Sequence, residues 1–361
     1  MTLARATVAL LVALLLAVAA MTYWLDRRGA KRLRVTNAEL RSETAGIRSN
    51  LVELRNEAAG LRSSIVELRN EIARLRSPTG VSLQPTSIEL GPADTYERLD
   101  HNWKSIGDAS GRTVVPCTDS GPLRPLVIVT LGQSNAANHG RGLYAPKHRV
   151  DNFNLYDGKC YKAVEPLLGP SGQGGNFATR LADMLIERRL ADRVVVAPIA
   201  MGGTTVEQWA LEGVFNRRIP ASIRRLYDAG LSPDYILWHQ GEGNAAASDV
   251  NGRQYRKNLL EVVASFRTYS IDASFFVALA TRCAATAHPN AVNVREGQRT
   301  AAIGQLGIFV GPDTDLIGSE HRYDECHMSE SGLVLHATAW ADVLEDFVKR
   351  GRPPSNDAKG R

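Results

Sequence analysis

Ser134, Asp324 and His327 are residues of the types that together cleave esters, and they stand far apart in the chain. A serine hydroxyl becomes a useful nucleophile when a neighbouring imidazole accepts its proton. Asp324 precedes His327 by three residues, so one short loop can present both, with the carboxylate holding the second ring N–H. The pattern predicts a Ser134–His327–Asp324 triad, provided that the fold brings Ser134 to this loop.

Glycine-containing polar clusters follow three apolar stretches of the sequence. They are Gly-Gln-Ser-Asn (132–135), Met-Gly-Gly-Thr-Thr (201–205) and His-Gln-Gly-Glu-Gly-Asn (239–244). Taken singly, each is typical of a turn or a helix cap. The carboxyl ends of parallel strands meet at one edge of a sheet, so together the clusters predict an active site there. An oxyanion formed at that edge needs N–H donors, and the backbones of Ser134 and Gly202 are the expected suppliers.

Four motifs carry a family resemblance: GQSNAANHG (132–140), GGTTVEQW (202–209), WHQGEGNA (238–245) and DECHMSESG (324–332). They resemble the SGNH hydrolase superfamily, and within it the sialate O-acetylesterase and acetylxylan esterase branch, carbohydrate esterase family six. The resemblance covers about residues 120–350. It implies a serine esterase that acts on acetylated sugars, and it leaves the particular glycan open.

The resemblance also leads us to expect a third oxyanion donor from a side-chain amide. The wider superfamily uses an asparagine in a Gly-x-Asn-Asp block, whereas this chain has glycine at that position. Gln240 and Asn244 are the alternatives, and the Gln-Gly-Glu of this branch favours Gln240. Gln133, Trp209 and Glu242 are weaker substrate-binding candidates. Trp209 could stack on a sugar or pack in the core, and Glu242 could orient its loop.

From residue 121 to 350 the sequence alternates apolar strands with amphipathic helices. The expected strands are 126–131, 193–200, 235–238, 274–281 and 308–311, and the expected helices are 176–190, 219–230, 252–267, 293–306 and 331–350. Strands that are apolar throughout and separated by helices are typical of a parallel sheet covered on both faces. We therefore predict an α/β fold, a three-layer α/β/α sandwich with a central parallel sheet, as in SGNH and flavodoxin-like proteins.

The first 120 residues have a different organisation. Residues 6–25 are uncharged and apolar, and a helix of that length spans a bilayer of about 30 Å. A transmembrane signal anchor is favoured over a cleaved signal peptide, because the apolar run exceeds the usual ~7–15 residues. Leucine and isoleucine recur every seven residues over 33–76, which predicts a coiled coil and therefore a homo-oligomer. A linker and lead-in (77–120) follows, and residues 351–361 form an expected disordered tail.

Charge and cysteine content narrow the function further. The net charge of +5 comes from the N-terminal segment, since residues 79–361 carry 30 cations and 31 anions, so nucleic acid is not an expected partner. No metal or nucleotide motif is present, so we expect no cofactor. Cys117, Cys160, Cys283 and Cys326 allow three pairings. We favour Cys117 with Cys160 and Cys283 with Cys326, and four free thiols are the alternative.

The leading hypothesis is a carbohydrate O-acetylesterase that works through an acyl-enzyme. We expect it to be held at a bacterial inner membrane, with the catalytic domain periplasmic or extracellular, although the positive-inside rule alone favours the opposite orientation. Two alternatives remain: an SGNH esterase or thioesterase for lipid-like acyl chains, and a non-catalytic envelope assembly factor that works through its coiled coil.

Overall fold

The computed structural model describes residues 103–118, 124–247, 250–284 and 288–351. The predicted signal anchor (6–25), the coiled coil (33–76) and the tail beyond Gly351 lie outside these residues. Among the described helices, none is long and apolar enough to cross a lipid bilayer.

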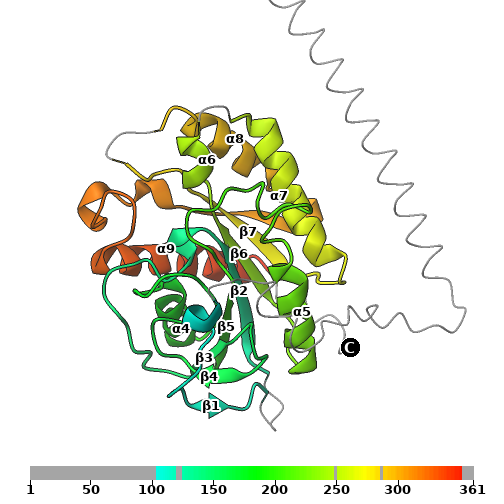
Figure 1. The fold of residues 1–361 in the computed structure, drawn as a ribbon, viewed down its shortest axis with the longest axis vertical. Helices are drawn as coiled ribbons and strands as arrows, with labels where there is room; N and C mark the ends of the chain where they lie inside the picture. The colour runs from blue at the N-terminus through cyan, green and yellow to red at the C-terminus, as the bar shows by residue number, and fades with distance from the viewer. Residues whose placement is uncertain (1–102, 119–123, 248–249, 285–287, 352–361) are drawn as a thin grey trace, which may run out of the picture. The chain divides into compact units, whose positions relative to one another are not determined.

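An eight-stranded sheet forms the centre of the described domain (Figure 1). Its strand order is β1-β4-β3-β5-β2-β6-β7-β8. The strands are β1 (Val114–Val115), β2 (Leu126–Gly132), β3 (Val150–Phe153), β4 (Cys160–Lys162), β5 (Val194–Pro198), β6 (Tyr235–His239), β7 (Ser274–Leu279) and β8 (Ile308–Asp313).

In the order of the sheet, every neighbouring pair from β3 through β5, β2, β6 and β7 to β8 is parallel, whereas β4 pairs antiparallel with both β3 and β1. The prediction of a parallel sheet is therefore correct for these six strands, and it did not include the antiparallel edge.

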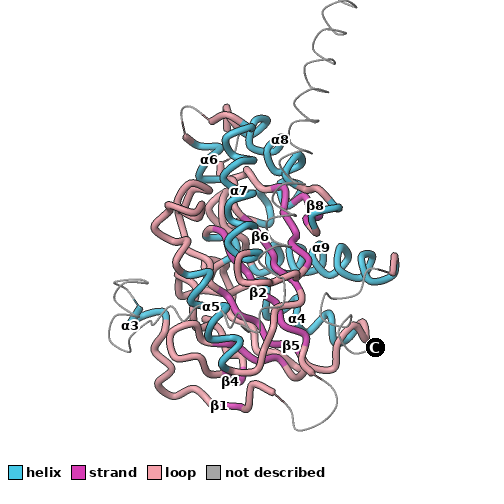
Figure 2. Tube along the Cα trace, turned by 90° about the vertical axis from the view of Figure 1, so that its right-hand side faces the viewer, coloured by secondary structure: helices cyan, strands magenta, loops and turns pink. Residues whose placement is uncertain are grey.

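The helices cover both faces of this sheet. They are α3 (Trp103–Ile106), α4 (Phe177–Glu187), α5 (Arg218–Asp228), α6 (Glu242–Ala246), α7 (Gly252–Arg267), α8 (Ala291–Ala301) and α9 (Glu330–Lys349). Four 3-10 turns are interspersed: η1 (Ser134–Ala136), η2 (Gly304–Leu306), η3 (Thr314–Leu316) and η4 (Ser319–His321). Figure 2 shows α5 and α9 on opposite sides of the strands.

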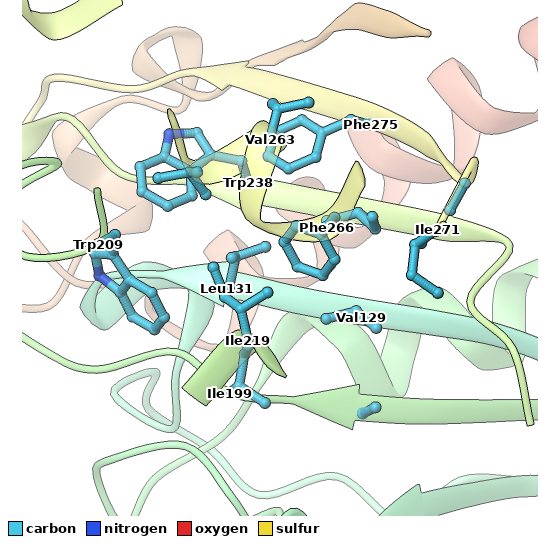
Figure 3. Close-up of a cluster of buried hydrophobic side chains, with 14 of the residues drawn as sticks. Val129, Leu131, Ile199, Trp209, Ile219, Trp238, Val263, Phe266, Ile271 and Phe275 are labelled. Atoms are coloured by element: carbon cyan, nitrogen blue, oxygen red, sulfur yellow. The ribbon is translucent and has the colours of Figure 1, made fainter. Parts of the chain in front are cut away.

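Alternation along β2 shows how the layers form. Val127, Val129 and Leu131 face the core that α5, α7 and α8 complete, whereas Leu126 and Ile128 face the core under α4 and α9. Successive side chains of a strand point to opposite faces, so an apolar strand fills two cores at once. Figure 3 shows part of the first core. The three-layer arrangement predicted from the sequence is confirmed for this domain.

Local capping explains where several helices begin. The side chains of Asn176, Asn251 and Ser329 accept hydrogen bonds from the first-turn N–H groups of α4, α7 and α9. These helices match the predicted segments 176–190, 252–267 and 331–350, and the five predicted strands are also present. The short strands β1, β3 and β4 and the helix α6 were not predicted.

Both favoured disulfides are present. Cys117, just after β1, is bonded to Cys160 in β4. Cys283, in the segment after β7, is bonded to Cys326, next to His327. The second bond therefore ties the loop that carries the predicted base to the end of a central strand.

Candidate active site

Ser134 lies at the carboxyl end of the central strand β2. It opens the 3-10 turn η1 and is 4% exposed. Gly132 makes this turn possible, because a Cβ there would lie 2.0 Å from the carbonyl oxygen of His239 on the neighbouring strand. As the first residue of the turn, Ser134 keeps its backbone N–H free of an acceptor within the turn. Its Oγ has no partner among the described residues and is not fully enclosed.

Asp324 and His327 lie in a tight loop between β8 and α9. An antiparallel bridge between Arg322 and Met328 closes the loop. Asp324 Oδ2 is 2.7 Å from His327 Nδ1, and Asp324 Oδ1 accepts the backbone N–H groups of His327 (2.6 Å) and Cys326 (3.1 Å). The carboxylate thus holds both the ring and its backbone. This is the predicted acid–base pair, and it leaves His327 Nε2 to act on a substrate or nucleophile.

The electrostatics of Asp324 suit this role. Burial raises the pKa of its carboxyl, but hydrogen bonds from the His327 side chain and backbone outweigh that effect and hold the pKa below its ordinary value. An ionised Asp324 can accept Nδ1–H, and such a carboxylate stabilises an imidazolium when the ring takes a proton.

The His327 ring is stacked with two aromatic rings. His139 lies 5.5 Å from it between centroids, with an interplanar angle of 23°, and Tyr323 lies 5.9 Å away at 24°. The Tyr323 hydroxyl donates to the His139 carbonyl oxygen at 3.0 Å, which joins the two flanking residues. Burial, and then the neighbouring His327, lowers the pKa of His139. Both effects favour the neutral form of His139 next to His327.

Asn135 connects η1, which we call the nucleophile turn after the predicted role of Ser134, to the loop that carries Asp324 and His327. Its Nδ2 donates to Glu242 Oε1 at 2.8 Å and to the carbonyl oxygen of Cys326 at 3.3 Å. The contact between Asn135 and Cys326 therefore joins the residue that follows Ser134 to the residue that precedes His327. No hydrogen bond links Ser134 Oγ to His327 in the described part of the chain, and in enzymes without substrate such bonds are often long.

The predicted oxyanion donors have different surroundings. The N–H of Gly202 donates to Ser171 Oγ at 2.7 Å, and Ser171 Oγ lies 3.1 Å from His139 Nε2. A Cβ at residue 202 would lie 2.7 Å from that Nε2, so glycine is needed for this close approach. Gly202 therefore lies next to the stacked rings. Its N–H is bound to Ser171 Oγ, and this hydroxyl would have to move before the N–H could bind an oxyanion.

Gln240 and Asn244 are bound within the protein. Gln240 Nε2 donates to Asn244 Oδ1 (2.7 Å), Thr204 O (3.1 Å) and Gln133 Oε1 (3.2 Å). Asn244 Nδ2 donates to Glu207 Oε2 at 2.9 Å. With these contacts Gln240 has no N–H left for a substrate. The expectation that Gln240 supplies the third donor is corrected on this ground, whereas Asn244 Nδ2 keeps one N–H beyond its contact with Glu207.

Gln133 differs from Gln240 because neither of its N–H groups has an acceptor among the described residues. Its Oε1 accepts the backbone N–H of Gly243 at 2.9 Å as well as Gln240 Nε2, which fixes the orientation of the amide. Its Nε2 has no hydrogen-bond partner among the described residues. This nitrogen is not fully buried, so a bound molecule can reach it. Gln133 is therefore the amide beside Ser134 with donors to spare.

Two substrate-binding candidates prove to be buried. Trp209 is 0% exposed, packs edge-on against Trp238 and donates from Nε1 to Thr204 Oγ1 at 2.9 Å. It is a core residue (Figure 3), and the sugar-stacking alternative is wrong for this conformation. Glu242 is 2% exposed and bound to Asn135 and His239, so it orients the loop and does not line the site.

His139, Ser171 and the linking role of Asn135 were not predicted from the sequence. His139 and Asn135 lie within the motif GQSNAANHG, so their position in that motif was an available signal. Ser171 belongs to a loop that had no motif at all. Its contact with Gly202 depends on a tertiary approach that local sequence does not encode.

Comparisons with known proteins bear on the family and the fold. Residues 125–345 match the family described as "Carbohydrate esterase, sialic acid-specific acetylesterase". A solved protein from Arabidopsis thaliana is 17% identical, covers 62% of this chain and 98% of its own, and superposes with a TM-score of 0.50, which supports the fold alone.

Further similar structures are NanS and a carbohydrate acetylesterase from Xanthomonas citri. NanS is 15% identical, with 66% of this chain and 99% of that chain covered and a TM-score of 0.46. The Xanthomonas protein is 14% identical, with 62% and 56% covered and a TM-score of 0.44. No curated protein sequence matches significantly. The family match spans more than half of the chain, and the chain accordingly belongs to the sialic acid-specific acetylesterase family of carbohydrate esterases and is a carboxylic ester hydrolase.

Proposed function

We propose that the chain removes O-acetyl groups from a carbohydrate through a Ser134–His327–Asp324 triad. The observation that carries this proposal is the Asp324–His327 pair, with Oδ2 and Nδ1 2.7 Å apart, on a loop joined to the nucleophile turn through Asn135. The family match supplies the reaction class.

The proposed reaction has two steps. Ser134 Oγ attacks the acetyl carbonyl carbon and its proton passes to His327 Nε2, while the C–O bond to the sugar breaks and His327 returns the proton to the sugar oxygen. Water then attacks the acetyl carbonyl carbon and His327 Nε2 takes a proton from that water. The bond between this carbon and Ser134 Oγ breaks, His327 returns the proton to Oγ, and acetic acid leaves and ionises to acetate. Asp324 keeps its proton-free state throughout and orients Nδ1–H.

We assign the oxyanion donors from the contacts described above. The backbone N–H of Ser134 has no acceptor in its turn, and Gly202 can turn its N–H to the oxyanion once Ser171 Oγ moves aside. Gln133 Nε2 is proposed as the third donor in place of Gln240, because its oxygen is fixed while its N–H groups have no partner among the described residues. Such donors together contribute several kcal/mol to transition-state stabilisation.

We also propose the cellular setting expected from the N-terminal sequence. In this proposal residues 6–25 anchor the chain in an inner membrane, residues 33–76 associate with copies of themselves, and the catalytic domain acts on a periplasmic or extracellular acetylated glycan. The two disulfides support an oxidising compartment for the domain. A reporter fused to the C-terminus, active on only one side of the membrane, tests the orientation.

Acetate release from a panel of acetylated glycans tests the function. We expect release from at least one glycan, and loss of it in Ser134→Ala. A series of para-nitrophenyl esters from acetate to octanoate separates the alternatives. A preference for acetate supports the carbohydrate esterase, a preference for octanoate supports the lipid-like esterase, and no turnover of any ester contradicts the proposal.

A further inference from the structure

A continuous row of buried polar side chains leads from the nucleophile turn to the last helix. Asn135 Nδ2 is 2.8 Å from Glu242 Oε1, which is 3.0 Å from His239 Nε2. On its other side, His239 Nδ1 is 3.0 Å from His336 Nε2, which Trp340 Nε1 approaches to 3.1 Å. All five side chains are at most 5% exposed, and they come from η1, α6, β6 and α9.

Hydrogen-bond chemistry fixes most of the protons in this row. An indole N–H can only donate, so His336 Nε2 must be an acceptor and the ring proton of His336 lies on Nδ1. His239 Nδ1 lies 3.0 Å from the same nitrogen, where it can hydrogen-bond only as a second donor that shares the one lone pair, and we place a proton on it as well. One proton then remains to be placed, between His239 Nε2 and Glu242 Oε1.

The surroundings favour that proton on His239. Glu242 Oε1 also accepts Asn135 Nδ2–H, a contact that strengthens with a charged acceptor. Burial raises the pKa of Glu242, but the charge of His239 and the hydrogen bonds from His239 and Asn135 lower it to about 2. Burial, followed by His239 and Arg322, lowers the pKa of His336, which keeps that ring neutral.

Two atoms of this row have no partner within the described residues. They are Glu242 Oε2 and His336 Nδ1, both buried. An unsatisfied buried polar atom costs about 1–3 kcal/mol. Apolar residues of similar shape would fill such a site at lower cost, so a purpose other than stability is indicated.

We infer that His239, with a proton on each ring nitrogen, forms an ion pair with Glu242 that positions the active site. Building on the proposed esterase function, we assign Glu242 as a positioning residue that acts through Asn135. Asn135 Nδ2 also contacts Cys326 O, and the buried Arg322 donates from Nη1 to that same oxygen. The ion pair thus holds Asn135 in the position from which it contacts Cys326, the residue that precedes His327.

The charge matters because of what a neutral acceptor would do. In Glu242→Gln, a His239 that has lost its proton presents a lone pair at Nε2, so the new amide turns its NH2 toward it. That NH2 can no longer accept Asn135 Nδ2–H, and Asn135 loses its anchor. A displacement of about 1 Å at a reacting group can cost 100-fold in rate.

Nitrogen NMR on the full-length chain labelled with 15N-histidine tests the charge. The chain has eight histidines, and His239→Gln and His336→Gln assign the two signals. We expect both His239 nitrogens protonated at neutral pH and His336 neutral with its proton on Nδ1. A signal from an unprotonated His239 nitrogen overturns the inference. This readout does not depend on esterase activity, so it stands apart from the proposed function.

Kinetics on para-nitrophenyl acetate test the positioning. We expect Glu242→Gln to lower kcat about 10- to 100-fold with KM nearly unchanged, and Asn135→Ala to lower kcat by a similar factor. Glu165→Gln is the matched control. Glu165 is 5% exposed, close to the 2% of Glu242, and it is paired with Arg180 outside this row. A wild-type kcat in a folded Glu242→Gln variant contradicts the positioning role. If that variant does not fold, Asn135→Ala decides, and a wild-type kcat there contradicts it equally.

Discussion

Replacing Asp324 by asparagine separates the catalytic role of this residue from its structural role. Asp324 Oδ1 holds two backbone N–H groups, and Oδ2 holds His327 Nδ1. The asparagine oxygen can keep the backbone contacts, which places its NH2 against Nδ1. Since two N–H groups cannot face each other, His327 must then carry its proton on Nε2, the wrong tautomer for a base.

The expected loss follows from this geometry. The same exchange in a fully buried triad costs about 10⁴-fold in kcat. Asp324 is 41% exposed, so water can partly replace it, and we expect a loss of about 10³-fold. That corresponds to about 4 kcal/mol in the activation barrier. The melting temperature should change little, because the Oδ1 contacts remain.

Turnover of para-nitrophenyl acetate, measured with the melting temperature on the same samples, checks this prediction. Asp313→Asn is the control, since Asp313 pairs with Arg295 outside the site; kcat should stay near wild type there while the melting temperature falls. A folded Asp324→Asn variant that keeps more than a tenth of the wild-type kcat would refute the assignment of Asp324 as the partner of the base.

Three further predictions follow from the contacts around the site. Gln133→Ala should lower kcat on acetyl esters about 100-fold through loss of an oxyanion donor, and a loss under threefold would remove Gln133 from that role. Exchanging Cys283 and Cys326 together for alanine opens a loop of 43 residues and should destabilise the domain by up to about 4 kcal/mol in urea unfolding; an unchanged unfolding midpoint would be inconsistent with the bond. Trp209→Phe should cost about 1–3 kcal/mol of stability without changing KM for any glycan, and a raised KM would return Trp209 to the substrate site.

The central fold was predictable because its pattern is local. β2 and β7 are apolar throughout and buried along their whole length, and such runs separated by amphipathic helices indicate a covered parallel sheet. β3 reads Val-Asp-Asn-Phe and β4 has three residues, one of them an exposed lysine. Neither shows an apolar run. β3 forms by pairing with β5, and β4 forms by pairing with β3, where the Cys117–Cys160 disulfide also holds it.

The site divides in the same way. Asp324 and His327 could be paired from the sequence, because their contact spans a single loop. The role of Gln240 could not, since it depends on acceptors contributed by Asn244, Thr204 and Gln133 from separate segments. Trp209 shows the same limit, because a tryptophan in a motif next to glycines is compatible with a sugar platform until the packing around it is known.

Covalent labelling tests the assignment of Ser134 as the nucleophile. Wild-type protein would be treated with a fluorophosphonate, digested and analysed by mass spectrometry, with esterase activity followed in parallel. We expect one adduct, on Ser134, that forms at the same rate as activity is lost. Labelling should be much slower in His327→Ala. Complete inactivation with the adduct on another residue, or full activity in Ser134→Ala, would contradict this assignment.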